Sequence, residues 1–412
     1  MAKALFIGYI WPEPKTTAAG QRMLQLLKVF KEKGFQVTFA TTAVKTKFSE
    51  DLEQFEIQTE SILLNDSSFN NFVKELKPDV VIFDRFMVEE QFGWRVAQCA
   101  PKALRILNTE DLHSLRNSRQ LAHKKGEKFT IKVWLQNNMT KREIASVYRS
   151  DLTLLVSHYE RKLLTAELKI SSELLFHLPF LLDTVTKTKQ ETYQTFEKRS
   201  DFICFGNGKH TPNIDAVRYL KEAIWPLIRK ELPFAKVHIY GAYLPQRIKE
   251  LNQPQIGFLI HGWMDDLDGE LRKARINLAP LRFGAGIKGK LTEAMQNGTP
   301  TVTTTIGSEG MFTTKCLPVV IAKNTLEFAQ AAVALYKDEN KWVNFQSAGF
   351  QTINSIFNKN ILAPRLFEKI EKLQQNLVEH RTSNFIGGLL QDETMASTKF
   401  MSKWIEEKNK EK

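Results

Sequence analysis

Short apolar runs alternate with amphipathic stretches along most of the chain. Each half contains six apolar runs that predict β-strands, and helical patterns such as 18–33 and 157–168 lie between them. Strands that alternate with helices predict an α/β protein with a parallel, doubly wound sheet in each half. The predicted strands are 4–9, 37–40, 80–83, 104–107, 152–156 and 174–177 in the first half and 202–205, 237–240, 258–261, 276–279, 301–304 and 319–321 in the second.

A polar stretch at 183–200 divides the two halves. It contains almost no aliphatic side chains, as expected of an inter-domain linker. The chain of 412 residues also exceeds the size at which a single core stops growing. We expect a first domain at 1–185, a second at 200–360, a helix at 361–380, and a mixed-charge tail at 381–412. The tail either makes an amphipathic contact or, as we expect, is frayed.

The formal net charge of +12 predicts anionic partners. The excess is largest at 113–149, where nine Lys or Arg stand against two Glu and apolar residues interleave with the charges. This pattern is typical of a basic helix with a packed inner face, and also of a segment that lies against anionic lipid. No motif indicates nucleic-acid binding.

The N-terminus is typical of a first strand rather than a secretory leader, and no apolar run approaches the length that spans a membrane. Three widely spaced cysteines exclude a disulfide framework and a cysteine metal site. We therefore expect a cytoplasmic protein, with peripheral contact to the inner face of the membrane as an option.

A glycine-rich stretch late in the second half has the features of an anion site. Gly284 and Gly286 precede a predicted helix at 287–297, which carries Lys288 and Lys290 near its start. Glycines let backbone N–H groups approach a ligand, and a helix N-terminus favours an anion. The alternative is a routine helix start with solvated lysines.

Two further features favour a site over that alternative. Glu293, in the middle of the same helix, can accept two hydrogen bonds from a ribose diol, and a second glycine-rich turn at 307–310 follows the next strand. Together these features predict that the second half binds a phosphorylated sugar nucleotide.

Four segments of the second half, at 205–228, 239–245, 261–302 and 306–311, resemble the donor-binding half of retaining GT-B glycosyltransferases of the family 4 type, the glycosyl transferases group 1. Segments of the first half resemble the acceptor-binding half, at 106–120 and 150–160. The resemblance implies two Rossmann-like domains that face each other across a cleft. A nucleoside-diphosphate sugar would lie mainly on the second domain, and the helix at 361–380 would cross back onto the first.

The resemblance also implies roles for individual residues. Glu293 would bind the ribose, the glycine loops would surround the diphosphate and sugar, and Gly20 would approach the phosphate from the first domain. His113 matches the position that touches the donor sugar, and Asp111 would orient it or bind acceptor. The implied catalytic pair is His113 and Asp111, and the implied donor-binding set is Gly20, Lys209, Gly284, Gly286, Lys288, Lys290, Glu293, Ser308, Glu309, Gly310 and Met311. The alternatives are a ligand-free helix start for Gly20 and simple strand-end packing for His113.

Two positions depart from the family pattern. Ala285 stands where many members carry the first of two glutamates, and Asn207 stands where many carry an arginine. Positive charge for the leaving diphosphate must then come from Lys288 and Lys290, with Lys209 as a third candidate. We expect no metal cofactor, and we interpret the adjacent acids at 265–266 as the N-terminal cap of a helix.

These observations predict a retaining glycosyltransferase that moves a hexose-type sugar from a nucleoside diphosphate to a glycan or lipid-linked acceptor, in cell-surface polysaccharide or glycolipid synthesis. Two alternatives remain. One is a non-catalytic subunit of the same fold that binds a nucleotide sugar or a glycan, which Ala285 keeps open. The other is a sugar-nucleotide epimerase, which needs more acid and base residues in the cleft than the sequence offers.

Overall fold

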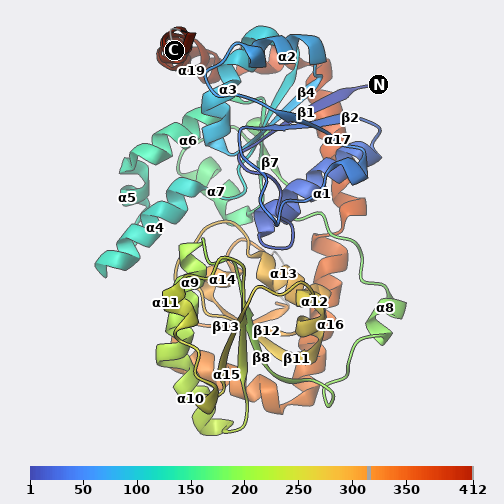
Figure 1. Cartoon of the computed structure of the whole chain (residues 1–412), viewed down its shortest axis with the longest axis vertical. Coiled ribbons are helices and arrows are strands. Elements are labelled where there is room, and N and C mark those ends of the chain that lie inside the picture. Colours follow the sequence, from blue (N-terminus) through green and yellow to red (C-terminus); the bar gives the residue numbers. More distant parts are fainter. Residues whose placement is uncertain (313–316, 411–412) are drawn as a thin grey trace.

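Two parallel β-sheets, one from each half of the chain, form the centres of two α/β domains (Figure 1). The computed structural model describes residues 1–312 and 317–410. The first sheet has the strand order β3-β2-β1-β4-β5-β6-β7, and the second has the order β10-β9-β8-β11-β12-β13. The neighbouring strands pair in parallel in both sheets. The predicted architecture of two doubly wound domains is therefore confirmed.

All twelve predicted strands form, and the structure adds one more. The first sheet consists of β1 (Lys3–Gly8), β2 (Gln36–Thr41), β3 (Gln58–Ser61), β4 (Val80–Asp84), β5 (Leu104–Asn108), β6 (Leu152–Leu155) and β7 (Leu175–His177). The second consists of β8 (Ser200–Phe205), β9 (Val237–Tyr240), β10 (Phe258–Gly262), β11 (Ala274–Ala279), β12 (Thr301–Thr304) and β13 (Val319–Ala322). The added strand, β3, is a polar and mostly exposed edge strand, so it lacks the apolar run that predicts the others.

Helices connect the strands in both domains. Those of the first domain are α1 (Ala18–Glu32), α2 (Ser68–Leu76), α3 (Phe86–Cys99), α4 (His113–Lys125), α5 (Ile131–Gln136), α6 (Asn138–Arg149) and α7 (His158–Ala166). A short helix, α8 (Lys187–Glu191), lies in the linker. Those of the second domain are α9 (Thr211–Tyr219), α10 (Trp225–Glu231), α11 (Gln246–Lys249), α12 (Leu267–Lys273), α13 (Gly289–Gln296), α14 (Thr305–Ser308), α15 (Thr325–Lys337) and α16 (Glu339–Ile356).

Side-chain caps fix where helices near the domain junction begin. Thr17 caps α1, and Ser157 caps α7 by accepting from the third backbone N–H of each helix. Asp266 caps α12 by accepting from the Gly269 N–H at 2.9 Å. The predicted capping role of the acids at 265–266 is therefore confirmed for Asp266.

The chain crosses between the domains twice, and the two crossings lie side by side. The Leu182 N–H donates to the Phe357 carbonyl, and the Lys359 N–H donates back to Leu182. The second crossing leads into α17 (Lys359–Gln375), which packs against the first domain. There the Phe367 ring meets the rings of Phe30 and Phe35 at centroid distances of 5.0 and 6.0 Å. The core of the first domain thus includes side chains from near the end of the chain.

The tail forms two helices, α18 (Leu377–Ser383) and α19 (Phe385–Lys410), so the expectation of a frayed tail is wrong. Two ion pairs attach these helices to the first domain, from Arg381 to Asp151 at 2.8 Å and from Glu406 to Arg95 at 3.3 Å. Asp151 and Arg95 are buried charged side chains that require ion-pair partners. The composition of the tail does not indicate that the tail supplies these partners. Within 1–312 and 317–410, no helix is both long and apolar enough to cross a membrane.

Candidate active site between the domains

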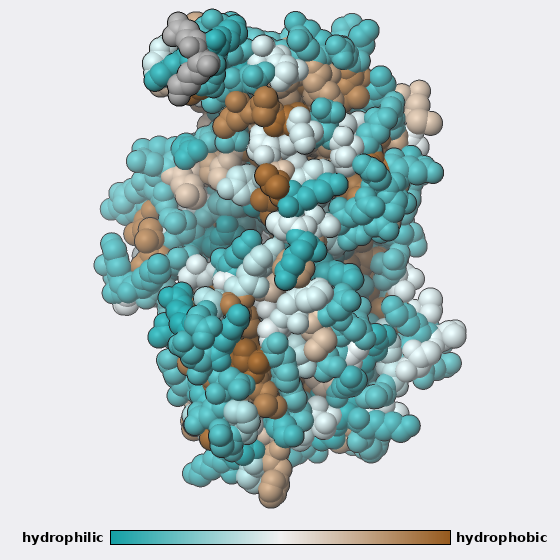
Figure 2. Space-filling model, viewed as in Figure 1, coloured by the Kyte–Doolittle hydropathy of each residue, from teal (hydrophilic) through white to brown (hydrophobic). Residues whose placement is uncertain are grey.

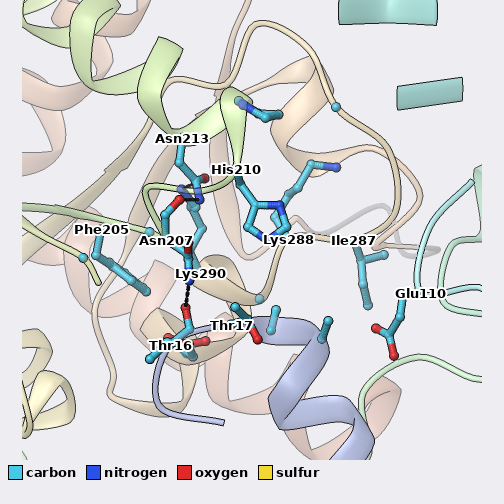
Figure 3. Close-up of a pocket in the computed structure, with 18 of the residues that line it drawn as sticks. Thr16, Thr17, Glu110, Phe205, Asn207, His210, Asn213, Ile287, Lys288 and Lys290 are labelled. Atoms are coloured by element: carbon cyan, nitrogen blue, oxygen red, sulfur yellow. Dashed lines mark hydrogen bonds between the residues drawn. The ribbon is translucent and has the colours of Figure 1, made fainter. Parts of the chain in front are cut away.

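A cavity lies between the two domains, at the carboxyl ends of the strands of both sheets. Parallel sheets place their ligands at this edge. In Figure 3, Thr16, Thr17 and Glu110 of the first domain face residues of the second. The lining residues used below are Arg85, Glu110, Asp111, His113 and Arg116 from the first domain and Asn207, Asn213, Gly284, Ala285, Lys288, Lys290 and Glu293 from the second.

The two predicted lysines of the second domain line this cavity. The Lys288 amine donates to the carbonyls of Ala285 and Gly286 at 3.0 and 2.8 Å, and burial lowers its pKa to about 8. The Lys290 amine donates to Asn213 Oδ1 at 2.8 Å, and burial lowers its pKa as well. Both amines lie next to the N-terminus of α13, where the helix dipole adds positive potential. This wall of the cavity suits an anion.

Glu293 lies one turn further along α13 and also lines the cavity. Burial, followed by the nearby charge of Asp268, raises the pKa of this carboxyl to about 7. Its side chain is half-buried, and no hydrogen bond or ion pair reaches it from the parts of the chain that the structure describes. A polar ligand would therefore find an acceptor there that is not already in use.

Gly20 and Lys209, two residues of the predicted donor-binding set, do not line the cavity. A Cβ at Gly20 would approach the backbone of Glu13 to 2.5 Å, so this glycine allows the start of α1 to pack against the preceding loop. The predicted approach of Gly20 to the donor phosphate stays a prediction. The exposed Lys209 places its amine 3.6 Å from the centroid of the Tyr243 ring.

The segment from Ser308 to Met311 does not line the cavity either, because it lies against the first domain. The Gly310 carbonyl accepts from the His158 N–H at 3.1 Å, and Met311 is buried in a cluster with Val156. Glu309 pairs with an arginine of α4. In this arrangement the second glycine turn joins the domains, and its predicted role in donor binding stays a prediction.

Asp111 lies in the loop between β5 and α4, His113 is the first residue of α4, and both line the cavity from the first domain. His113 Nδ1 is 3.1 Å from the Asp111 carbonyl oxygen and 3.4 Å from Asp111 Oδ1. Burial lowers the pKa of His113 to about 4, so the imidazole is neutral at pH 7. The structure brings both residues of the predicted catalytic pair together at the cavity.

Glu143 of α6 holds the start of α4, although its sequence context gave no indication of this role. Its Oε1 accepts from the His113 N–H at 2.8 Å, and its Oε2 accepts from the N–H and the hydroxyl of Ser114 at 3.1 and 2.6 Å. Burial raises the pKa of Glu143 to about 7. A side chain 30 residues away thus caps the helix that carries His113, and no local pattern could have shown it.

The first domain also supplies cationic side chains to the cavity. Arg85 and Arg116 line the cavity, and Arg116 donates to Asp111 Oδ2 at 2.8 Å. Burial acts to raise the pKa of Asp111, but the charges of Arg116, His113 and Arg85 hold it below its usual value. Arg85 and Glu110 both have positive φ, at 77° and 60°, which is uncommon outside glycine. Such backbone conformations occur preferentially at functional sites.

The basic segment folds into α4, α5 and α6, of which α4 and α5 lie at the left edge of the molecule in Figure 1. Its inner face is packed, since Trp134 is fully buried and donates to Ser114 Oγ at 2.8 Å. Its outer face carries exposed lysines at 124, 125, 128 and 132, together with the half-exposed Val133. Figure 2 shows hydrophilic side chains over most of this side of the molecule.

Comparisons with known proteins point to one family and one fold. Residues 199–338 match the family model described as Glycosyl transferases group 1. No curated protein matches the chain. HepE of Anabaena, solved with UDP and glucose, is 13% identical, with a TM-score of 0.64 over 90% of this chain and 100% of that one. Sucrose-phosphate synthase of Thermosynechococcus elongatus is 13% identical, with a TM-score of 0.66 over 90% and 99%.

A third similar structure is WaaG, described as a glycosyltransferase involved in lipopolysaccharide biosynthesis. It is 9% identical, with a TM-score of 0.62 over 88% of this chain and 98% of that one. At such low identities the likeness establishes the fold alone. That fold is GT-B, with two Rossmann-like domains on either side of a cleft.

Proposed function

We propose that this chain, which matches the family model of the group 1 glycosyl transferases over residues 199–338, is a retaining glycosyltransferase that uses a nucleoside-diphosphate sugar as donor. One observation carries the proposal. The Glu293 carboxylate has no partner among the described residues and lies on the same helix as two amines, in a cavity that both domains line. This arrangement suits a ribose next to a diphosphate. HepE, of the same fold, was solved with UDP and glucose.

The chemistry we propose is mainly electrostatic. As the bond from sugar to phosphate breaks, negative charge develops on the leaving diphosphate, and cationic groups preorganised around it lower the barrier. Lys288 and Lys290 lie on the second-domain wall, and Arg85 and Arg116 lie on the first. The acceptor hydroxyl attacks from the face that the diphosphate leaves and gives its proton to the leaving phosphate oxygen, which retains the configuration at the sugar carbon without a protein nucleophile. We propose that the reaction needs no metal ion.

His113 would contact the donor sugar from the first domain. Because its imidazole is neutral at pH 7 and Nδ1 faces the Asp111 carbonyl oxygen, the other ring nitrogen, Nε2, can accept a hydrogen bond from a sugar hydroxyl. Asp111 accepts from Arg116 and lies against His113, so it would keep the ring in position.

For the acceptor we propose a glycan or a lipid-linked sugar, in cell-surface polysaccharide or glycolipid synthesis. The exposed lysines of α4 and α5 favour an anionic acceptor or an anionic membrane surface close to the cavity. The reaction would then take place on the cytoplasmic side, with the protein bound peripherally. A second candidate is a subunit that binds a nucleotide sugar without turnover. It is favoured by Ala285, a lining residue that cannot bond to a sugar hydroxyl.

Thermal unfolding with UDP, GDP, ADP, dTDP and CMP tests the donor site. A nucleotide at about 100 times its dissociation constant stabilises the folded state by about 2.7 kcal/mol. We expect one nucleoside diphosphate to raise the Tm of the parent by several degrees, and Glu293→Ala to remove that shift. Glu250→Ala, at an exposed glutamate far from the lining residues, is the control and keeps the shift.

An equal shift in the Glu293→Ala variant would contradict our placement of the ribose, and no shift with any nucleotide would contradict the donor site. The matching sugar nucleotides then test turnover. Release of the nucleoside diphosphate only in the presence of acceptor supports transfer. Conversion of the sugar without acceptor indicates an epimerase, and binding without either reaction indicates the non-catalytic subunit.

A further inference from the structure

One carboxylate oxygen of the first domain receives hydrogen bonds from both sides of the cavity. Glu160 of α7 is 1% exposed, and its Oε1 accepts from the Gly286 N–H at 2.6 Å and from the Leu112 N–H at 3.2 Å. Gly286 belongs to the second domain and Leu112 to the first. The two N–H groups therefore share one acceptor across the domain junction.

The N–H groups of Leu112 and Gly286 belong to the two segments that hold the residues proposed to act on the donor. Leu112 stands between Asp111 and His113, and Gly286 stands two residues before Lys288. The loops touch at this point, since a Cβ on Gly286 would come within 2.8 Å of Asp111 Cβ. Gly286 also has a φ of +64°, which favours glycine. A change in the Glu160 contact would therefore alter the distance between the donor loop and the His113 loop.

Capping of α7 does not explain the position of the Glu160 side chain. Ser157 caps α7 by accepting from the Glu160 N–H at 3.4 Å, which is half of a capping box. In the other half, the glutamate side chain would return to the Ser157 N–H. Instead it reaches the other domain, and its Oε2 is buried without a partner among the described residues. A buried polar oxygen that is left without a partner lowers the stability of the fold.

A second side chain of the first domain contacts the same loop. Arg119 donates to the Gly284 carbonyl at 2.8 Å, two residues before the amide that Glu160 binds. The first domain thus holds the glycine loop at one carbonyl and one N–H. With two fixed points so close together, the loop has little freedom to shift relative to the first domain.

We propose that Glu160 is a positioning residue, which fixes the donor loop of the second domain against the loop of Asp111 and His113 when the domains are closed. The inference deepens the proposed function and rests on it for its effect on transfer. The contact itself exists without substrate, so it can be tested apart from any activity. Glu160 does not line the cavity, and its effect on the reaction would be indirect.

Hydrogen exchange of the full chain, measured by mass spectrometry without ligand, tests the contact directly. We expect Glu160→Ala to speed exchange at the Gly286 and Leu112 amides about tenfold, because both lose their acceptor. Glu160→Gln keeps an amide oxygen in place and should exchange like the parent. Unchanged exchange in α15 of the second domain would confirm that each variant is folded. Glu160→Asp, whose shorter arm cannot reach both N–H groups, replaces the alanine variant if that variant does not fold.

The kinetic consequence is measured on the same variants. We expect Glu160→Ala to lower kcat for transfer about tenfold while the Kd for the nucleoside diphosphate stays within a factor of about three, and Glu160→Gln to restore kcat. Exchange at Gly286 that does not respond to Glu160→Ala or Glu160→Asp would overturn the proposed contact. Faster exchange with unchanged kcat would overturn its role in positioning. If the parent transfers no sugar, the proposed function fails, while the exchange result still decides whether the contact joins the domains.

Discussion

Arg119 and Glu309 form a two-point ion pair across the domain junction, with Nη1 to Oε2 at 2.6 Å and Nη2 to Oε1 at 3.0 Å. Arg119 is nearly buried, and its guanidinium also lies over the rings of Phe129 and Tyr159. The pair is therefore screened from water and well oriented, which distinguishes it from a surface ion pair of little energetic value.

Breaking this pair from one side should lower stability. Arg119→Met leaves the Glu309 carboxylate half-buried and without its partner, and we expect the free energy of unfolding to fall by about 2–4 kcal/mol. Glu309→Gln in the same background should recover part of that loss, because the uncompensated charge is gone. Urea unfolding of the single and double variants measures the coupling. Purely additive effects would show that the two side chains do not stabilise each other.

Nucleotide binding should become weaker at alkaline pH through Lys288. Burial lowers the pKa of this amine to about 8, and a bound diphosphate would raise it again by favouring the charged form. Binding should then take up a proton above about pH 8, and affinity should fall as the pH rises further. Titration calorimetry at pH 9 in two buffers of different ionisation enthalpy measures the uptake. Lys288→Arg, which stays charged, serves as the control, and equal proton uptake in that variant would refute the assignment.

Stability should depend on pH through Glu143. The pKa of this carboxyl is about 7 in the folded protein because of burial, above its ordinary value of 4.5. A raised pKa contributes stability that is complete below about pH 4.5 and is lost as the pH rises to about 7. Glu143→Gln removes this dependence and keeps one acceptor oxygen for the His113 or the Ser114 N–H group, while its NH2 group takes the place of the other oxygen. We expect it to gain up to about 3 kcal/mol relative to the parent between pH 5 and pH 8.

Urea unfolding at both pH values checks this expectation, with the exposed Glu250→Gln as the matched control. The control should change the free energy of unfolding equally at the two pH values. A Glu143→Gln variant that behaves like the control would mean that Glu143 titrates normally in the folded protein.

The basic outer face of α4 and α5 should bind anionic vesicles. Each lysine near such a surface contributes about 1 kcal/mol, so changing 124, 125, 128 and 132 from Lys to Glu should largely abolish cosedimentation with phosphatidylglycerol vesicles. The matched control changes the same number of exposed lysines in the second domain, at 230, 236, 249 and 341. Equal losses would reflect net charge alone, and no loss in the first variant would remove the membrane from the proposal.

The fold was largely predictable from the sequence, because buried parallel strands appear as apolar runs that a local pattern reveals. The exception, β3, is polar and exposed. Lys288, Lys290 and Glu293 could be placed together from the sequence, because their pattern is local to one loop and helix, and their roles in donor binding stay predictions. Other roles depend on contacts between distant segments. Glu160 is 126 residues from Gly286, and Arg119 is 190 residues from Glu309.

The contacts of the second glycine turn also depend on distant segments. The glycines of this turn are typical of a ligand-binding loop. Nothing in the sequence of the turn indicates that Arg119 and His158 of the other domain contact it. The resemblance supplied roles from proteins in which this turn meets a ligand. In this structure the turn contacts the first domain, and its predicted role in donor binding stays a prediction.

The packing of α17 against Phe30 and Phe35 has a consequence for the order of events during synthesis. The first domain cannot complete its core when its own sheet leaves the ribosome, because Leu366, Phe367 and Ile370 are encoded beyond the whole second domain. At roughly 5–20 residues per second, the roughly 180 residues in between take on the order of 10–40 s to make. During that interval the aromatic surface of α1 is uncovered on the nascent chain, where a chaperone can protect it.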